Sequence, residues 1–420
     1  MRALPGKVKH TFITYKTPIV YASSSIIKAF ATLVAGFFIA KFISPEDLGL
    51  WTTLSLFIIY ALFLQGGVIN GLNLELPLSF GEGKNKRGRL MVSVAQTFTL
   101  YLSVAFFLVG ILLYFFFPFE SDKVKYGVLA VSFIIVFTFY QNHLLSTFRS
   151  NNSFLKLSYL QIVDAVVNLI TILLVFYFSY YGMLLKAVIV IILFVILLHI
   201  NRPIKVIMKW DKKIFLKLFK VGFPIFILAY AESLALTFDK LMLIRFTDLK
   251  NLGFYSFALY ALVFSTLFSN SIASYIYPKM SFQYGKDKNK LILWQYVKKI
   301  TALLLIIQIP LFVVGYFVIP KVVTDFFPNY IESIVPMQIL LFAGIMKGSV
   351  IGVNVIWSMK KWKYMIIYQA SYSVLVVGFI YLFINLYSNK IIGVSFGLMY
   401  ANIANLIMGV FLSYKATHTN

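Results

Sequence analysis

The sequence predicts an all-α membrane protein with twelve transmembrane helices in two six-helix lobes, and three observations lead to this prediction. Of the 420 residues, 60% are hydrophobic and only 12% are charged, whereas roughly 25% are charged in a typical soluble protein. Apolar runs long enough to cross a bilayer recur from one end of the chain to the other,. The chain also resembles itself when it is shifted by about half its length.

The individual spans are read as mostly apolar runs between turn residues or charges, because a helix needs roughly 20 such residues to cross the hydrocarbon core. The predicted spans cover residues 18–41, 48–78, 90–117, 125–148, 157–179, 182–200, 218–245, 250–278, 294–319, 333–358, 364–387 and 391–413. The second and eighth are longer than a bilayer requires, so we expect them to tilt or to extend beyond it.

Charge in the connecting loops predicts the orientation. Basic residues gather in alternate loops, at 81–89, 201–217, 283–290 and 360–363, while the loops between them are short and nearly uncharged or acidic, as at 45–47. The positive-inside rule then places both termini in the cytoplasm and the protein in the cell membrane, the inner one where there are two. The basic N-terminal segment, with Arg2 and Lys7, has no cleavage site after it, and we interpret it as a retained cytoplasmic segment.

Several function classes are excluded by composition. The net charge of +24 comes from these loops and not from basic stripes with interleaved aromatic residues, so we expect no nucleic-acid partner,. The chain has no cysteine, and its four histidines are scattered without ligand spacing,. We therefore expect no metal, no cofactor and no catalytic residues.

The internal repeat is carried by matching loops. AKFISPEDLGLW at 40–51 aligns without a gap with IRFTDLKNLGFY at 244–255, 204 positions further on, and SFGEGKNK at 79–86 aligns with SFQYGKDK at 281–288. Convergent loop chemistry is the alternative explanation. Six spans in each half would relate the lobes by a pseudo-twofold axis along the membrane normal. We predict an N-terminal lobe at 1–200, a basic cytoplasmic linker at 201–217 and a C-terminal lobe at 218–420.

Charged residues inside the first lobe are candidates for a water-filled cavity, because a charge in the bilayer is costly. Lys28 lies in the middle of the first span, and we expect a cavity-facing cation or, alternatively, a structural ion pair. Gln161, Asp164 and Asn168 fall on one helical face of the fifth span,. This stripe is either the wall of a lumen or a set of interhelical hydrogen bonds.

The second lobe has corresponding candidates. Glu232 and Asp239 share a face of the seventh span, which suits a proton or cation relay, although Asp239 and the adjoining Lys240 could instead be wetted at the interface,. Lys347 lies deep in the tenth span, and Asn354 returns to nearly the same face seven residues later.

Other polar residues in the spans are interpreted more cautiously as packing groups. Asn70 is a candidate for the lumen, and Glu75 lies near the cytoplasmic end of its span. Gly66 and Gly67 would permit close helix packing or a break in the second span.

Two motifs resemble a known group. The first span ends in G-F-x-x-x-K-x-I-S-P-E-D-L-G-x-W (36–51), and the seventh contains F-D-K-L-M-L-I-x-x-F followed by L-G-x-Y-S-x-A (238–258). Together with the span count and the repeat, these motifs resemble the polysaccharide-exporter branch of the multidrug/oligosaccharidyl-lipid/polysaccharide (MOP) flippase superfamily, in particular the Wzx-type O-antigen or capsule repeat-unit flippases.

The resemblance implies a transporter and not an enzyme. Its substrate would be a polyprenyl-pyrophosphate-linked oligosaccharide, an O-antigen, capsule or exopolysaccharide unit, moved from the cytoplasmic to the outer leaflet for a polymerase or ligase. Lys28 and Lys347 could bind the pyrophosphate, and Asn70, Gln161, Asn168 and Asn354 could contact sugars. Asp164, Glu232 and Asp239 are candidates for ion coupling.

Two alternatives remain. A drug or metabolite exporter of the same superfamily would share the two-lobe plan, although two deep lysines disfavour cationic drugs. A membrane glycosyltransferase or polymerase would normally need a large outer loop with catalytic groups, and the longest one here is a short stretch around residues 320–332.

Overall fold

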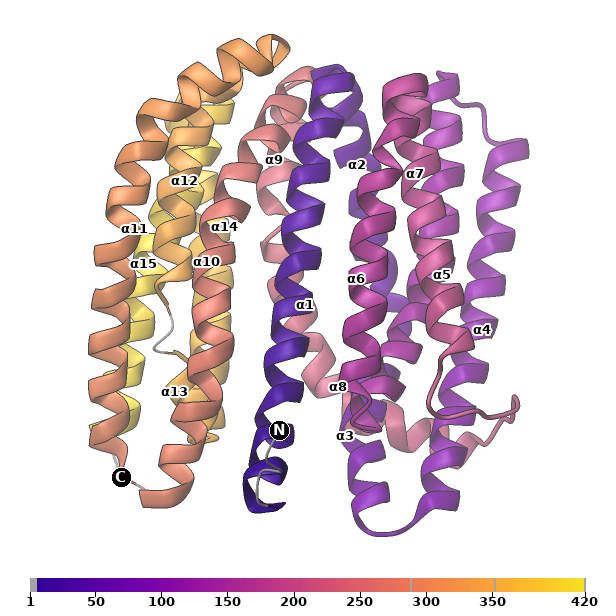
Figure 1. The fold of residues 1–420 in the computed structure, drawn as a ribbon. Helices are drawn as coiled ribbons and strands as arrows, with labels where there is room; N and C mark the ends of the chain where they lie inside the picture. The colour runs from indigo at the N-terminus through magenta and orange to yellow at the C-terminus, as the bar shows by residue number, and fades with distance from the viewer. Residues whose placement is uncertain (1–5, 288, 351–352, 419–420) are drawn as a thin grey trace, which may run out of the picture. The chain divides into compact units, whose positions relative to one another are not determined.

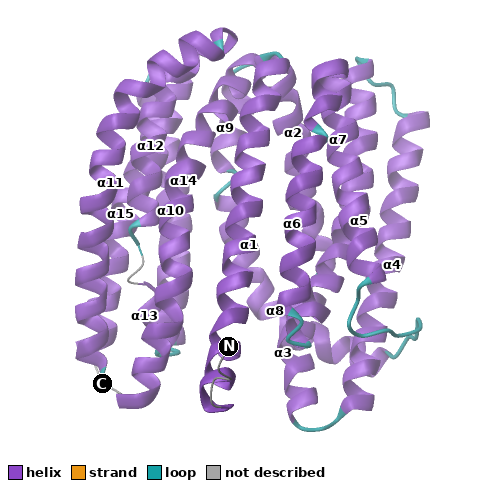
Figure 2. Ribbon diagram, viewed as in Figure 1, coloured by secondary structure: helices purple, strands orange, loops and turns teal. Residues whose placement is uncertain are grey.

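A computed structural model describes residues 6–287, 289–350 and 353–418. Arg2 of the basic N-terminal segment and Lys288 of the repeated loop lie outside this part of the chain. Within it, the secondary structure consists of helices and loops, with fifteen α-helices and two 3-10 helices (Figures 1 and 2). The predicted all-α class is confirmed.

Ten helical stretches in the described residues are long and apolar enough to cross a membrane. The predicted spans at 157–179 and 250–278 are not among these ten, but both positions are helical, in α6 (Phe154–Ile170) and α10 (Leu249–Asp287). α6 has only 17 residues because it ends at Thr171. The chain is therefore a multi-pass membrane protein, and each predicted span contains helix among its described residues.

The contacts within the chain define two compact units. Unit 1 contains residues up to Ala35 together with Leu54–Tyr230, and unit 2 contains Gly36–Thr53 together with Ala231–Asn420. These units rest on contacts, whereas the lobes at 1–200 and 218–420 rest on the repeat, so the lobe boundaries stay a prediction.

Unit 1 is a bundle in which neighbouring helices pack in pairs, such as α4 with α5 and α6 with α7 (Figure 1). It contains most of α1 (Gly6–Phe42), the end of α2 (Pro45–Ala61), α3 (Val68–Gly81), α4 (Asn85–Phe116), α5 (Asp122–Ser150), α6, α7 (Ile172–Ile200) and most of α8 (Lys212–Ala235). Fully buried Leu72, Leu76 and Leu218 belong to one of its apolar cores.

The predicted second span is broken in its middle. After α2 comes a short 3-10 helix, η1 (Leu62–Gln65), and α3 begins only after Gly66 and Gly67, which have φ angles of 53° and 81°. Glycine adopts this left-handed region without steric cost. A Cβ on Gly67 would lie 2.7 Å from the backbone carbon of Gly222 in α8, so the pair also lets two helices approach closely. Both expectations for these glycines are confirmed.

A second irregularity lies inside α7. Ser179 has non-helical angles (φ 47°, ψ −122°), and residues on its two sides form separate helical segments. The boundary at Ser179 agrees with the predicted end of the fifth span at residue 179 and start of the sixth at residue 182.

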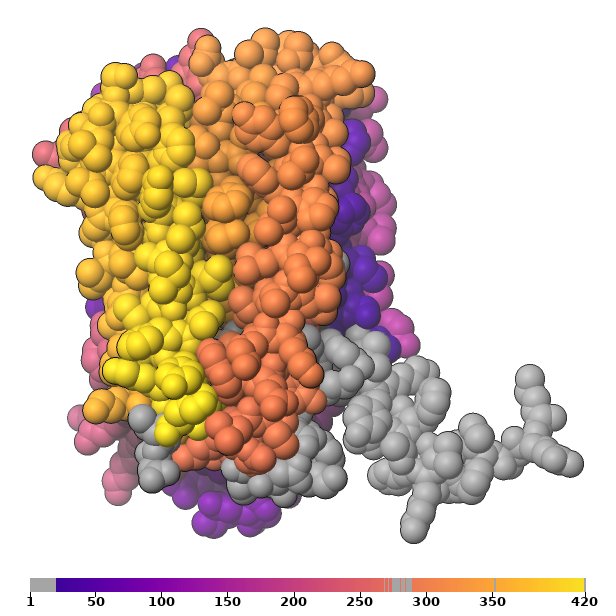
Figure 3. All heavy atoms as spheres, turned by 90° about the vertical axis from the view of Figure 1, so that its left-hand side faces the viewer, coloured from indigo at the N-terminus to yellow at the C-terminus, as the bar shows by residue number. Residues whose placement is uncertain are grey.

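Unit 2 is built around α10, which packs on α12, and around the pair of α14 and α15. Its further elements are α9 (Phe238–Phe246), α11 (Lys290–Phe326), η2 (Pro328–Ser333), α12 (Ile334–Gly348), α13 (Val353–Ser358), α14 (Trp362–Leu386) and α15 (Lys390–His418). Figure 3 shows α11 in orange and α15 in yellow side by side along one face of this unit.

The repeated loops meet inside unit 2. A Cβ on Gly49 would lie 1.8 Å from the carbonyl oxygen of Leu249, and one on Gly253 would lie 1.7 Å from that of Pro45. In the 204-residue repeat, Gly253 is the equivalent of Gly49 and Leu249 is the equivalent of Pro45, so the two contacts are equivalent to each other. Such reciprocal contacts are the signature of a local twofold axis.

Candidate functional site

A charged cluster lies among the helices of unit 1. Lys28 of α1 and Asp164 of α6 form an ion pair with 2.7 Å between Nζ and Oδ2, and the exposed fractions of their side chains are 30% and 5%. Both residues lie on apolar helices, and the Asp164 carboxylate is buried, so it is shielded from water. The structural alternative predicted for Lys28, an ion pair, is therefore present.

A second lysine completes this cluster. Lys186 of α7, only 6% exposed, donates a hydrogen bond to Oδ1 of Asn168, and the charge of Asp164 also acts on it. The amide of Asn168 in turn donates to the hydroxyl of Thr32 at 3.3 Å. We call Lys28, Asp164, Asn168 and Lys186 the lysine–aspartate cluster. With two ammonium groups and one carboxylate, the cluster has an excess positive charge.

The polar stripe of α6 continues beyond the ion pair. Gln161 accepts hydrogen bonds from the hydroxyls of Ser24 at 2.9 Å and Ser25 at 3.3 Å, both on α1. On the other side, the Lys28 ammonium lies 4.1 Å from the ring centroid of Phe194, a cation–π geometry,. The expected face of Gln161, Asp164 and Asn168 is thus turned towards α1 and α7.

Unit 2 holds two carboxylates, Glu232 near the end of α8 and Asp239 in α9. Glu232 accepts a hydrogen bond from Nε2 of Gln369 in α14. Asp239, only 3% exposed, accepts one from the Tyr255 hydroxyl at 2.7 Å, and Lys240 lies 3.6 Å from its other oxygen. The alternative of a wetted, interfacial Asp239 does not fit this burial.

Lys347 lies in α12 and is half-buried. The charges of Glu232 and Asp239 act on it, but with the described side chains it forms neither a hydrogen bond nor an ion pair. We call Glu232, Asp239 and Lys347 the acidic cluster. Lys240, 3.6 Å from Asp239, is a second ammonium beside the two carboxylates, so the cluster and Lys240 together have no excess charge, unlike the lysine–aspartate cluster.

The other predicted residues are not brought into either cluster. Asn70 on α3 and Asn354 on α13 are both half-buried, and no described side-chain contact joins them to the clusters. Glu75, expected near an interface, pairs with Lys217 of α8 within unit 1.

Sequence reasoning missed Lys186. It lies inside the predicted span at 182–200, within the most apolar of the ten membrane-length stretches. The signal that could have identified Lys186 was a single charge within a strongly apolar run, since such a charge requires a partner or a cavity.

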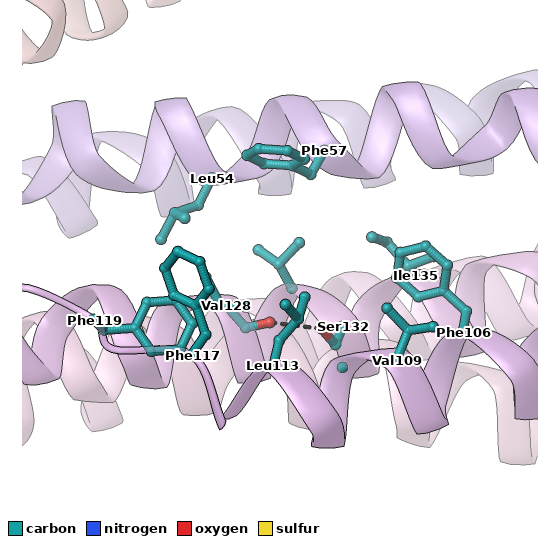
Figure 4. A pocket seen from close by; sticks show the side chains of 12 residues that line it. Leu54, Phe57, Phe106, Val109, Leu113, Phe117, Phe119, Val128, Ser132 and Ile135 are labelled. Carbon is teal, nitrogen blue, oxygen red and sulfur yellow. Dashed lines mark hydrogen bonds between the residues drawn. The ribbon is translucent and has the colours of Figure 1, made fainter. Parts of the chain in front are cut away.

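A separate cavity of about 230 Å³ in unit 1 is lined by α2, α4 and α5 (Figure 4). Leu54 and Phe57 of α2 face Val109 and Leu113 of α4 across it. Its single polar side chain, Ser132, donates its hydroxyl to the carbonyl of Val128 at 2.8 Å. The cavity suits an alkyl chain and not a charged group.

No group of three or more His, Asp or Glu side chains among the described residues is placed to hold a metal ion. The chemistry available in these clusters is therefore that of ammonium, carboxylate and amide groups, which bind anions, protons and sugars.

Comparisons with known proteins agree with this architecture. The lipid II flippase MurJ in an inward closed conformation is 18% identical, with a TM-score of 0.71 over 94% of this chain and 87% of that one. An inward-facing multidrug resistance MATE family transporter of the MOP superfamily is 13% identical, with a TM-score of 0.68 over 95% and 98%. A mutant of the Vibrio cholerae MATE transporter VcmN, also 13% identical, gives 0.57 over 96% and 97%.

The family comparison covers more than two thirds of the chain. No curated protein matches it in sequence. The family described as polysaccharide biosynthesis protein matches residues 38–336. This match and the shared fold confirm the resemblance predicted from the motifs at 36–51 and 238–258. The chain belongs to the polysaccharide biosynthesis protein family and has the fold of MOP-superfamily transporters.

Proposed function

We propose that the chain is an alternating-access flippase that moves a polyprenyl-pyrophosphate-linked oligosaccharide from the cytoplasmic to the outer leaflet of the cell membrane. The observation that carries this proposal is the excess positive charge of the lysine–aspartate cluster, on the apolar helices α1, α6 and α7. A lipid-linked pyrophosphate is a strong anion that must pass the hydrocarbon core, and a buried cation can receive it there.

Lys28 is the proposed first contact for the pyrophosphate. Its side chain is 30% exposed, whereas Asp164 is buried behind it, so an incoming anion can approach the ammonium without displacing a helix. Lys186 then balances Asp164 once Lys28 turns to the substrate. Lys347 is the corresponding cation proposed for unit 2, and Asn70, Gln161, Asn168 and Asn354 are proposed to contact the sugars.

The acidic cluster is proposed to couple transport to an ion gradient. Glu232 and Asp239 are carboxylates inside an apolar stretch of membrane-crossing length. Glu232 has the neutral donor Gln369 as its partner, whereas Asp239 has both the Tyr255 hydroxyl and the Lys240 ammonium. A carboxylate paired in this way can take up a proton or a cation and release it on the other side. Asp164 is a further candidate for this role.

The orientation and partners form part of the same proposal. The basic loops support cytoplasmic termini, with lobes at 1–200 and 218–420 joined by the linker at 201–217. The oligosaccharide delivered to the outer leaflet would be consumed by a polysaccharide polymerase or ligase, and this chain would not itself be an enzyme.

The deciding experiment locates lipid-linked oligosaccharide in cells that lack this protein. Repeat units should accumulate on the cytoplasmic leaflet, and the wild-type chain should clear them while Lys28→Ala and Lys186→Ala should not. Repeat units that reach the outer leaflet normally, in cells without a second flippase, would overturn the proposal.

A small-molecule exporter is the second candidate, because the carboxylates of the acidic cluster could bind an organic cation. It predicts that cells lacking the chain accumulate such cations while the leaflet distribution of repeat units is unchanged. The two measurements made in the same strain separate these functions.

A further inference from the structure

A basic cleft lies at one end of unit 1 and shares no lining residue with the lysine–aspartate cluster. Two adjoining cavities, of about 660 and 620 Å³, share Lys86 and Arg89 as lining residues. The larger is also lined by Arg202, Lys205 and Lys209. We call these five residues the basic cleft. No aspartate or glutamate lines either cavity.

The fold holds this cleft in a defined shape. Lys86 and Arg89 lie three residues apart in the first two turns of α4. The segment 201–211 runs along α4, where Ser93 donates its hydroxyl to the carbonyl of Ile207 and Thr97 donates to that of Lys209 at 3.0 Å. Figure 2 shows this segment as the long loop beside α4. These bonds keep the linker lysines next to the helix.

The charges of the cleft are not balanced by the protein. The first turn of α4 has no acidic residue. Basic groups at this end of a helix are destabilised, because the helix dipole is positive there. The buried Nε of Arg202 has no hydrogen-bond partner among the described residues, while its Nη1 donates to the carbonyl of His199 at 2.8 Å. An anion in the cleft would offset the unfavourable positive charge at the start of α4.

The nearest carboxylate in the loop before α4 is already engaged. Glu82 forms an ion pair of 2.9 Å with Lys84. The hydrogen bond from Lys84 and its charge lower the pKa of Glu82, so this carboxylate stays ionised on Lys84 and does not line the cleft.

The surroundings of the cleft indicate a membrane surface. The cleft lies where α4 begins and where α5 and α7 end, and all three are membrane-length helices. Between Lys205 and Asp211, the linker exposes Ile207 (73%), Met208 (48%) and Trp210 (51%). Exposed apolar residues with a tryptophan beside basic groups are typical of the headgroup region of a bilayer.

We propose that the basic cleft binds the phosphate headgroup of a lipid in the adjoining leaflet. The ammonium and guanidinium groups bind the phosphate, and Ile207, Met208 and Trp210 lie against the acyl or prenyl chain. The ligand is either an anionic phospholipid of the bilayer or a prenyl-phosphate carrier lipid. This inference concerns binding alone and does not depend on the proposed flippase activity.

Quenching of Trp210 fluorescence by brominated lipids tests the proposal on the full chain in nanodiscs. Brominated phosphatidylglycerol should quench more strongly than brominated phosphatidylcholine at equal mole fraction. This excess should disappear in Trp210→Phe, which shows that it reports on the cleft and not on the other four tryptophans.

Two double variants that each remove two positive charges test whether binding depends on the cleft residues in particular. Lys86→Gln/Arg89→Gln should weaken phosphatidylglycerol binding about 10-fold or more. Arg87→Gln/Lys213→Gln removes one arginine and one lysine that are exposed but do not line the cavities, and should retain it. Equal quenching by both lipids, or an equal loss in both double variants, would overturn the proposal.

Competition identifies the source of the phosphate. Displacement of brominated phosphatidylglycerol by farnesyl diphosphate at a lower concentration than by unbrominated phosphatidylglycerol would assign the cleft to a prenyl carrier lipid, and the reverse order to a bilayer phospholipid. Displacement by inorganic pyrophosphate as effectively as by either lipid would show a site for soluble anions and contradict a lipid ligand.

Discussion

The hydroxyl oxygens of Thr52 and Ser256 lie 2.8 Å apart and are hydrogen-bonded, although 204 positions separate them in the chain. Both are buried, at 7% and 8% exposure. The same spacing relates the loop at 40–51 to the loop at 244–255, so equivalent positions of the two halves of the repeat meet here. Together with the reciprocal packing of Gly49 and Gly253, this bond marks a local twofold axis within unit 2,.

Close packing at this axis predicts that Gly253→Ala is destabilising. The added Cβ would lie 1.7 Å from the backbone oxygen of Pro45, which cannot move as a flexible side chain would. We expect the free energy of unfolding to fall by about 1–3 kcal/mol. Thermal unfolding of the purified protein measures this change.

The matched control is Gly378→Ala in α14, where a Cβ meets nothing within 4 Å. Alanine is the better helix former, so this variant should be as stable as the wild type or more stable. Equal unfolding temperatures for the two variants would contradict close packing at the axis.

The ion pair of unit 1 predicts coupled effects on stability. Asp164→Leu leaves Lys28 and Lys186 without a carboxylate, and we expect it to cost about 1–3 kcal/mol because Lys186 is buried. Lys28→Met/Asp164→Leu leaves a single buried ammonium that keeps its bond to Asn168, and should recover part of that loss. Chemical denaturation of both variants and of Lys28→Met gives the coupling energy, and additive losses would show that the pair contributes nothing.

Lys186 is predicted to act on transport and not on folding. Lys186→Met leaves Lys28 to neutralise Asp164, so the cluster loses its excess charge while no carboxylate is left unpaired. We expect outward movement of an anionic lipid-linked substrate to fall at least about 10-fold, with an unchanged unfolding temperature. The exposed Lys363→Gln is the control for a lost lysine, and normal transport by Lys186→Met would remove this residue from the site.

Ion coupling predicts a specific phenotype for Glu232→Gln. The new amide oxygen can still accept the hydrogen bond from Gln369, so chiefly the negative charge is lost. Transport into proteoliposomes should lose its dependence on an imposed proton or sodium gradient. Asp248→Asn, a loop position whose oxygen caps Asn251, should keep that dependence; if both variants keep it, Glu232 is not the coupling residue.

The sequence predicted helix faces better than it predicted partners. The i, i+3, i+7 spacing of Gln161, Asp164 and Asn168 was sufficient to put these residues on one face, because helix geometry is local. That Lys186 meets the same face depends on how α6 and α7 pack after the turn at Ser179, which no spacing reveals. The excess positive charge of the lysine–aspartate cluster also follows from packing, since only contacts place Lys28 beside Asp164 and Lys186 beside Asn168.

The break at Gly66 and Gly67 and the ends of the spans could be predicted from the sequence for a related reason. A glycine changes the backbone, and a charged loop residue changes solvation, at its own position. Both can therefore be interpreted without knowing which residues pack against them. Asn70 and Asn354 show the limit, because polarity within a span does not say whether a side chain reaches a cluster.

The chain passes between the two units three times, after Ala35, Thr53 and Tyr230, and each passage lies inside a helix: α1, α2 or α8. No hinge loop is available at these points. Any change in the angle between the units must therefore bend three helices together, against their continuous backbone hydrogen bonds. Gly36 at the first passage and Pro224 one to two turns before the third are where such bending costs least,. Stiffness of these helices, and not the length of a linker, would then set the rate at which the units exchange conformations.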